Sequence, residues 1–328
     1  MIITKTPLRV SFCGGGSDIP AFYRAHGGCV LSTSINKYMF IMIHPYFHDG
    51  MTVLKYSKTE IVKDIKDIEH SIFNYVLNKY NLCGVEITSM ADIPAGTGLG
   101  SSSSFTVGLL HTVNAYMGKL TSKPKLAENA CEIEIEHLKS PIGKQDQYAA
   151  AMGGLNFIRF NANDSVTVDP LLIKKAVSDE LQENLLMFYT GEVRNANEIL
   201  IEQTANSIKS DKIDNLKQMC RLAETMKEEL ENGNISVFGD ILNESWQLKK
   251  SLASGISSGI IDDIYDTAIK NGAKGGKLLG AGGAGFFLFY CEKDKQANLR
   301  KAINLKELPF SFENDGTSII FIGDKYWD

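Results

Sequence analysis

The sequence predicts an α+β protein of two domains, and three observations lead to this fold class. Its 328 residues exceed the roughly 250–300 residues at which a single hydrophobic core usually stops growing. Residues up to about 170 alternate strand-like with helix-like segments, whereas the rest combines long helical stretches with short apolar strands. We therefore expect a first domain at residues 1–170 and a second at residues 171–328, with a cleft between them.

The first expected domain mixes strands and helices. Apolar side chains recur at helical spacing in residues 101–117, and a second helix is expected at residues 124–139, with a proline near its first turn. β-branched and aromatic residues are concentrated in segments that should form strands, at residues 7–13, 30–43, 84–90 and 155–160.

The second expected domain follows a polar stretch, residues 161–169, which ends at Pro170 and is the candidate linker. Long helices should occupy much of residues 196–271. Short apolar segments predict strands at residues 185–189, 285–291 and 318–322.

Composition limits the classes of function. Charged residues make up 22% of the chain, the net charge is −5 and no basic block occurs, so neither nucleic acid nor a membrane surface is an expected partner. The six scattered cysteines form no CxxC pair, which favours a reducing compartment. Since no signal peptide or spanning segment is recognisable, we expect a cytoplasmic protein that acts on small molecules. The sequence leaves the oligomeric state open, and a homodimer is one of the alternatives.

A glycine and serine segment is the strongest candidate for a binding site. Its alternating glycines let backbone amides approach a ligand closely, and the first amides of the helix that follows lack intrahelical partners. Such a loop attracts phosphate groups. The competing interpretation, a flexible linker, fits poorly because an amphipathic helix begins directly after it. The candidate phosphate-binding residues are Pro94, Gly96, Gly98, Leu99, Gly100, Ser101, Ser102 and Ser103.

Glu134 is an acidic residue in an unusual position. In the helix expected at residues 124–139 it projects with apolar side chains, whereas Glu136 lies on the polar face. An unpaired carboxylate buried there would cost several kcal/mol, so a cation should compensate it. That cation is either an Arg or Lys side chain or a magnesium ion, which prefers carboxylate and hydroxyl oxygens.

Two further acids lie beside turns. Asp146 follows the helix breakers Ser140 and Pro141 and stands at an expected helix start, where it serves either as an N-cap or as a reactive acid. Near the N-terminus, a strand carrying Arg9 leads into a glycine turn that ends at Asp18. A carboxylate next to such a turn can clamp sugar hydroxyls.

Two common nucleotide motifs are excluded. Gly280, Gly282 and Gly285 match GxGxxG, but the segment after them reads as a strand, whereas the dinucleotide fingerprint requires a helix. Close backbone packing beside the nucleotide site is the expected role of these glycines. No Gly-Lys pair precedes Ser or Thr, so a Walker A loop is absent from the sequence.

Together these segments resemble the GHMP kinases (galactokinase, homoserine kinase, mevalonate kinase and phosphomevalonate kinase) along nearly the whole chain. Residues 94–104 are similar to the signature P-x-G-x-G-L-G-S-S-A-A and depart from it only at Ser103 and Ser104. Residues 7–18 are similar to the galactokinase opening P-G-R-V-N-L-I-G-E-H-T-D, and residues 277–286 to the third glycine-rich motif. Within the family, the turn before Asp18 most resembles that of bacterial D-glycero-D-manno-heptose 7-phosphate kinases.

The resemblance implies a ribosomal protein S5 domain 2-like N-terminal domain, a ferredoxin-like C-terminal domain, and the cofactors ATP and Mg²⁺. Ser102 and Glu134 would be the magnesium ligands, with Glu136 as the rival of Glu134. Asp146 would face the acceptor hydroxyl with Arg9 as its cationic neighbour. The implied sugar-binding residues are Asp18, Gly15, Gly16 and Ser17.

The same resemblance implies the reaction. A sugar kinase would phosphorylate the anomeric hydroxyl of heptose 7-phosphate to give heptose 1,7-bisphosphate, for nucleotide-activated heptose and capsule or lipopolysaccharide synthesis. Lys144, Arg159 and Arg194 are candidates for binding the substrate phosphate. The alternatives are a fucose or galactose 1-kinase, a nicotinamide dehydrogenase, and a non-catalytic sugar-sensing relative. The last would typically have lost one of the metal or acid residues that this sequence retains.

Overall fold

The first half of the chain is built on an eight-stranded sheet in the computed structural model, which describes residues 1–48, 50–191, 196–207 and 209–323. The strands follow the order β12-β1-β2-β5-β3-β4, while β6 pairs with β2 and β7 with β6. Among the strand pairs of this sheet that the structure describes, only β3 and β5 run parallel. The strands are β1 (Ile2–Cys13), β2 (Gly28–Pro45), β3 (Thr52–Lys55), β4 (Thr59–Val62), β5 (Val85–Ala91), β6 (Leu155–Phe160), β7 (Val166–Pro170) and β12 (Ser318–Ile322).

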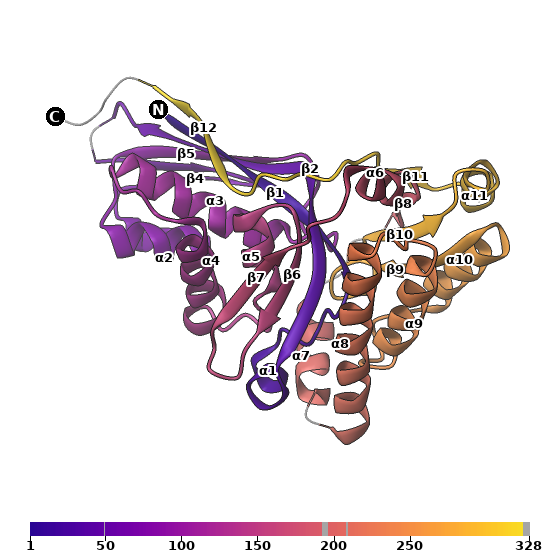
Figure 1. The fold of residues 1–328 in the computed structure, drawn as a ribbon. Helices are drawn as coiled ribbons and strands as arrows, with labels where there is room; N and C mark the ends of the chain where they lie inside the picture. Colours follow the sequence, from indigo (N-terminus) through magenta and orange to yellow (C-terminus); the bar gives the residue numbers. More distant parts are fainter. Residues whose placement is uncertain (49, 192–195, 208, 324–328) are drawn as a thin grey trace.

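Helices cover one face of this sheet (Figure 1). α3 lies at its centre against β1 and β2, because its apolar residues face the strands. The helical elements of the first half are α1 (Pro20–His26), a 3₁₀ turn (Ile65–Asp67), α2 (Ser71–Tyr80), α3 (Ser101–Tyr116), α4 (Lys123–Cys131), a π-helical turn (Glu132–His137) and α5 (Gln145–Met152).

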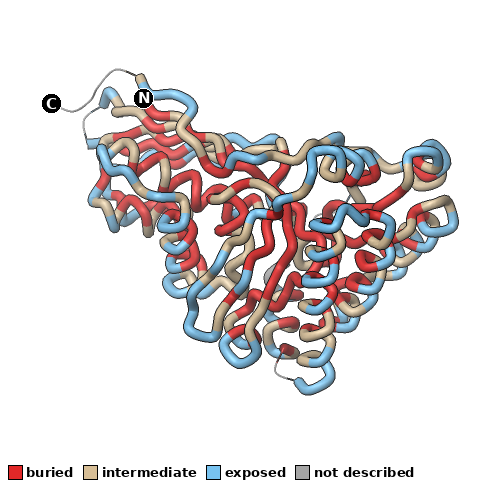
Figure 2. Tube along the Cα trace, in the orientation of Figure 1, coloured by how far each residue is buried: buried red, intermediate tan, exposed pale blue. Residues whose placement is uncertain are grey.

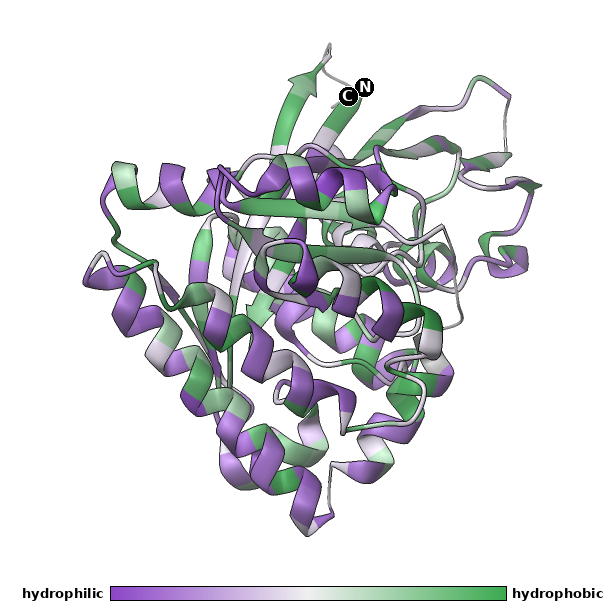
Figure 3. Cartoon of the chain, turned by 90° about the vertical axis from the view of Figure 1, so that its right-hand side faces the viewer, coloured by the Kyte–Doolittle hydropathy of each residue, from purple (hydrophilic) through white to green (hydrophobic). Residues whose placement is uncertain are grey.

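The second half holds a four-stranded antiparallel sheet in the order β11-β8-β10-β9. The chain passes through it in the β-α-β-β-α-β sequence typical of ferredoxin-like folds. Figure 3 shows its helices banded in hydrophilic and hydrophobic residues, as expected for helices with one buried face. The elements are α6 (Lys175–Glu183), β8 (Leu185–Tyr189), α7 (Ala196–Asn206), α8 (Ser210–Glu231), α9 (Phe238–Lys250), α10 (Gly259–Lys270), β9 (Ala273–Leu278), β10 (Phe286–Cys291), α11 (Gln296–Ile303) and β11 (Lys306–Glu307).

A continuous apolar core joins the two halves. Residues of β1 such as Phe12 pack with Phe238 of α9 and Tyr290 of β10, and the ring centroids of Phe12 and Phe238 are 5.2 Å apart. Figure 2 shows the buried residues running through the central strands into the second half. The loops above this interface are therefore held in a fixed relation to one another.

The predicted strands are confirmed. The helix predicted after the candidate phosphate-binding segment, residues 94–104, which we call the phosphate loop, is also confirmed. Three expectations need correction. Residues 161–169 are not a linker, because β7 turns back and pairs with β6 from Val166 onward. The helix expected at residues 124–139 is α-helical only to Cys131 and then widens into the π-helical turn. The strand at residues 318–322 pairs with β1, so this segment lies with the first half of the chain. In the part of the chain that is described, no helix combines the length and apolar character needed to cross a membrane.

Candidate active site

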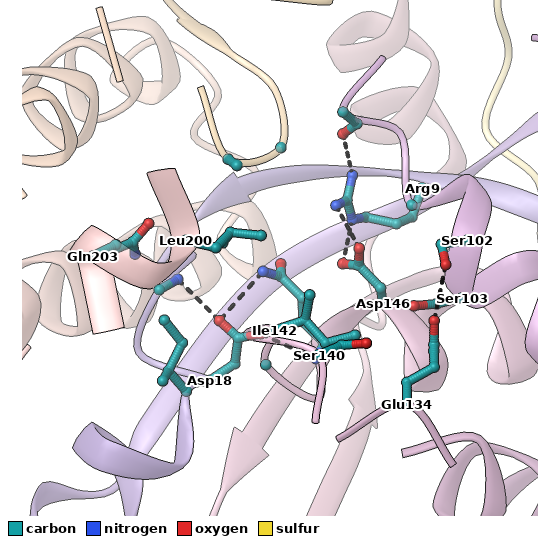
Figure 4. Close-up of a pocket in the computed structure, with 18 of the residues that line it drawn as sticks. Arg9, Asp18, Ser102, Ser103, Glu134, Ser140, Ile142, Asp146, Leu200 and Gln203 are labelled. Carbon is teal, nitrogen blue, oxygen red and sulfur yellow. Dashed lines mark hydrogen bonds and ion pairs between the residues drawn. The ribbon is translucent and has the colours of Figure 1, made fainter. Parts of the chain in front are cut away.

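A cavity of about 240 Å³ lies where the two halves meet, and most of the predicted site residues line it (Figure 4). The first half contributes the phosphate loop, the π-helical turn and the start of α5. The second half contributes α7, α9 and the loop after β9. The cavity is thus formed by segments that are far apart in the sequence.

The phosphate loop has the backbone that its glycines predict. Gly96, Gly98 and Gly100 have φ angles of 76°, 85° and 75°, a region that other residues rarely adopt. α3 begins at Ser101, directly after them. A Cβ atom on Gly98 would lie 2.4 Å from the carbonyl oxygen of Leu279, so the third glycine-rich loop packs on the phosphate loop backbone to backbone. The predicted packing role of that loop is confirmed.

Glu134 lies in the π-helical turn and is 2% exposed. Its carboxylate accepts hydrogen bonds from Ser102 Oγ at 3.0 Å and Gln147 Nε2 at 2.8 Å. Burial raises its pKa above the ordinary value. No Arg or Lys side chain within the described ranges pairs with it, so the structure does not support compensation by a protein cation. A buried carboxylate beside a hydroxyl suits a magnesium ion.

Glu136, the rival for this role, lies on the surface. Its side chain is 55% exposed, and its carboxylate is 3.8 Å from Arg24. It does not line the cavity. Of the two glutamates, only Glu134 is placed to meet a ligand on the phosphate loop.

Arg9 and Asp146 form an ion pair in the cavity. The guanidinium of Arg9 donates two hydrogen bonds to the Asp146 carboxylate, from Nε at 2.7 Å and Nη2 at 2.8 Å. Its Nη1 donates to the carbonyl oxygen of Gly98 at 2.6 Å. Asp146 lies in the first turn of α5 and makes no capping bond, so the N-cap interpretation is wrong. The pair fixes an acidic group directly beside the phosphate loop.

Asp18 lies at the end of the cavity away from Ser102 and Ser103 of the phosphate loop (Figure 4). Its buried carboxylate accepts from the backbone N–H of Gly16 at 2.9 Å and of Gln145 at 3.2 Å. The side-chain amide of Gln145 approaches it at 3.3 Å, whereas its buried Oε1 has no hydrogen-bond partner. Burial raises the pKa of Asp18. This end of the cavity therefore offers acceptors for ligand hydroxyl groups.

Family comparisons identify this arrangement. Residues 61–154 match the GHMP kinases N terminal domain, and residues 226–307 match the GHMP kinases C terminal domain. The chain is 32% identical to the D-glycero-alpha-D-manno-heptose 7-phosphate kinase of Campylobacter jejuni, over 96% of this chain and 97% of that protein. The chain belongs to the GHMP kinases. It is an ATP-dependent phosphotransferase of the sugar kinase type.

Other similar proteins support the same family assignment. The crystal structure of a D-glycero-D-manno-heptose 1-phosphate kinase from Bacteroides thetaiotaomicron superposes with a TM-score of 0.81 at 28% identity, over 99% of this chain and 100% of that one. The L-fucokinase/L-fucose-1-P guanylyltransferase of Bacteroides fragilis is 27% identical over 90% of this chain, which corresponds to 35% of that larger protein. The GHMP-kinase fold is therefore shared along the whole chain.

Four of the residues predicted to bind ligands in this GHMP kinase do not line the main cavity. The hydroxyl of Ser17 is bonded to the backbone of Cys29, at 2.9 and 3.0 Å. Gly15 lies in the same turn and does not line the cavity either. Leu99 is fully buried in the core and fixes the loop by accepting from the Arg9 amide at 3.0 Å. Pro94 lines a neighbouring cavity instead.

Two of the three cations suggested for a substrate phosphate are also placed elsewhere. Lys144 lies 3.3 Å from the Asp164 carboxylate, and Arg159 pairs with Asp169 on the surface. Neither lines the main cavity, and Arg194 lies outside the described residues. Sequence reasoning missed Lys249 of α9, which does line the cavity, and it missed Gln145. Lys249 carried no signal because it occurs in an ordinary amphipathic helix.

A second cavity, of about 620 Å³, lies on the other side of the phosphate loop. Its walls are largely apolar and aromatic, and the rings of Tyr56 and His70 meet edge to face at 4.8 Å. Burial lowers the pKa of His70, which favours the neutral ring. Residues 94–96 and Ser102 line this cavity, so it borders the loop that is predicted to bind phosphates.

Proposed function

We propose that this kinase transfers the γ-phosphoryl group of ATP to the anomeric hydroxyl of D-glycero-D-manno-heptose 7-phosphate. The product would be heptose 1,7-bisphosphate, an intermediate toward nucleotide-activated heptose for surface polysaccharide. The identity of 32% to a heptose 7-phosphate kinase over nearly the whole chain supports this acceptor. A cytoplasmic location fits both the sugar phosphate substrate and the six free cysteines.

The nucleotide would occupy both cavities. Its base fits the apolar cavity beside Tyr56 and His70, and its phosphates fit the amides between Gly96 and Ser102. Ser102 and Glu134 would hold Mg²⁺, since their oxygens meet at 3.0 Å and no protein cation within the described part of the chain pairs with the carboxylate. When bound, the metal ion would offset negative charge on the phosphate oxygens.

The acceptor sugar would lie between the two acids of the main cavity. Asp18 and the free Oε1 of Gln145 would accept hydrogen bonds from its hydroxyl groups. Asp146 would accept or orient the proton of the attacking hydroxyl, and Arg9 would stabilise the ionised acid. The observation that carries the proposal is this bidentate pair, which places the acid next to both the phosphate loop and the sugar end of the cavity.

A substrate panel tests the proposal. ADP formation should be measured with heptose 7-phosphate, the same heptose without phosphate, L-fucose and D-galactose, and scored by kcat/KM. We expect the phosphorylated heptose to be preferred by about 10²-fold or more, because each lost charged contact to a phosphate costs about 1.5–3 kcal/mol. A preference for L-fucose would support the second candidate function, a fucose 1-kinase, which the similarity to the L-fucokinase favours.

A further inference from the structure

Lys249 is a buried cation in the main cavity that the proposed reaction does not yet use. It lies at the end of α9, is 5% exposed and lines the cavity. Its ammonium group donates a hydrogen bond to the carbonyl oxygen of Gly280 and forms no ion pair with a described residue. Because an ammonium group carries three donors, two remain available to a ligand.

The charge of Lys249 lacks an anionic partner of its own. Burial, with Arg9 nearby, lowers its pKa to about 8. The neighbouring acids act in the opposite direction but are engaged elsewhere, Asp146 by Arg9 and Asp18 by Gly16 and Gln145. A buried cation without a dedicated partner is costly, and binding of an anion would offset that cost.

The position of Lys249 indicates which anion this is. A Cβ atom on Gly280 would lie 2.4 Å from Cα of Gly98, so the residue whose carbonyl oxygen holds Lys249 packs directly on the phosphate loop. Arg9 is the other cationic side chain that lines the cavity within the described ranges. Its three hydrogen bonds go to Asp146 and Gly98. Lys249 is thus the cation with free donors at the phosphate-loop end.

We infer that Lys249 contacts the phosphoryl group that ATP transfers, approaching it from the second half of the chain while Ser102 and Glu134 approach from the first. Negative charge is spread over the oxygens of this group during transfer, and a fixed cation at that point stabilises the transition state. Lys249 would therefore be a catalytic residue. The inference rests on the kinase activity but does not depend on which sugar is the acceptor.

The test uses Lys249→Met and Lys249→Gln in the full-length protein. The glutamine variant keeps a donor for the Gly280 carbonyl oxygen and removes only the charge. We expect both variants to lose about 10²–10³-fold in kcat, the range for loss of one transition-state donor. In equilibrium titrations, affinity for a non-hydrolysable ATP analogue should fall about tenfold or more, while affinity for ADP should stay close to that of the wild type.

Lys277 provides a matched control. It is also a buried lysine bonded to a backbone carbonyl group, that of Phe12 at 3.1 Å, but it does not line the cavity. Lys277→Met should keep both kcat and the ratio of the two nucleotide affinities. An equal loss in this control, or an unchanged affinity ratio in both Lys249 variants, would overturn the inference.

The acceptor panel separates this inference from the proposed acceptor. A loss confined to phosphorylated acceptors would assign Lys249 to the substrate phosphate and contradict the inference. If the wild-type protein phosphorylates none of the proposed sugars, the proposed acceptor is wrong, and the nucleotide titrations still decide the role of Lys249.

Discussion

At the scale of single residues, the site combines acids with very different surroundings. Asp146 is held by two hydrogen bonds from Arg9, whereas Glu134 is buried with only hydroxyl and amide partners. Burial raises the pKa of Glu134 and so disfavours its charged form. The two acids are therefore suited to different roles, one toward the acceptor hydroxyl and the other toward a metal ion.

Asp146→Asn tests the first role. Asparagine keeps the shape of the side chain but cannot take up a proton, so turnover should fall by about 10²-fold or more, within the range for loss of a general base. Steady-state kinetics and an ADP titration would show lost turnover with nucleotide binding retained. Asp169→Asn, which removes the acid of a surface pair with Arg159, is the control and should not change turnover. Near-normal turnover in the first variant would remove Asp146 from the mechanism.

Glu134→Gln tests the second role through stability as well as activity. Because burial raises the pKa of Glu134, its ionised form costs the folded state free energy at neutral pH, and glutamine removes that cost. Without metal, the melting temperature should equal or exceed that of the wild type at pH 7. This advantage should vanish as pH falls below the ordinary value of 4.5, where the wild-type acid is protonated in both states.

The variant should also lose turnover and the additional thermal stabilisation that Mg²⁺ gives with ATP. Glu136→Gln is the matched control, since Glu136 lies two residues further along and is exposed. It should keep turnover and the response to Mg²⁺. A Glu134 variant that still responds to Mg²⁺ would show that the metal ion binds elsewhere.

At the scale of elements, two loops and one irregular helix create the site. The phosphate loop and the loop after β9 touch through their glycines, so neither tolerates a side chain there. The π-helical turn adds a residue to the end of α4, where Glu134 turns toward Ser102. π-helical turns occur often at functional sites, because the wider turn redirects a side chain.

Gly98→Ala tests the contact between the loops. Its φ of +85° and the 2.4 Å approach to Leu279 O predict both backbone strain and a clash, so unfolding free energy should fall by about 1–3 kcal/mol. ATP affinity should fall with it. Gly84→Ala is the control, since Gly84 has a φ of +71° with open space around it. Thermal unfolding and ATP titration should show a smaller loss of stability and normal affinity in the control. Equal effects in both variants would mean that the contact between the two loops does not contribute to the free energy of unfolding.

At the scale of the whole molecule, the cavity exists because the two halves share a core. Phe12 of β1 packs on Phe238 of α9, so the loops at the end of β1 meet those of the second half. β12 returns to the first sheet and links the end of the described chain to its beginning. The shared core thereby brings the candidate site residues of both halves to one cavity.

The sequence by itself determined the α+β class, the phosphate loop and the acids Glu134, Asp146 and Asp18, because glycine backbones, helix starts and misplaced charges leave local patterns. Only the tertiary structure decided the rest. The pairing of β7, the π-helical turn and the place of Lys249 in the cavity depend on contacts between distant segments. Packing against residues far along the chain leaves no spacing in the local sequence, so periodicity could not reveal these features.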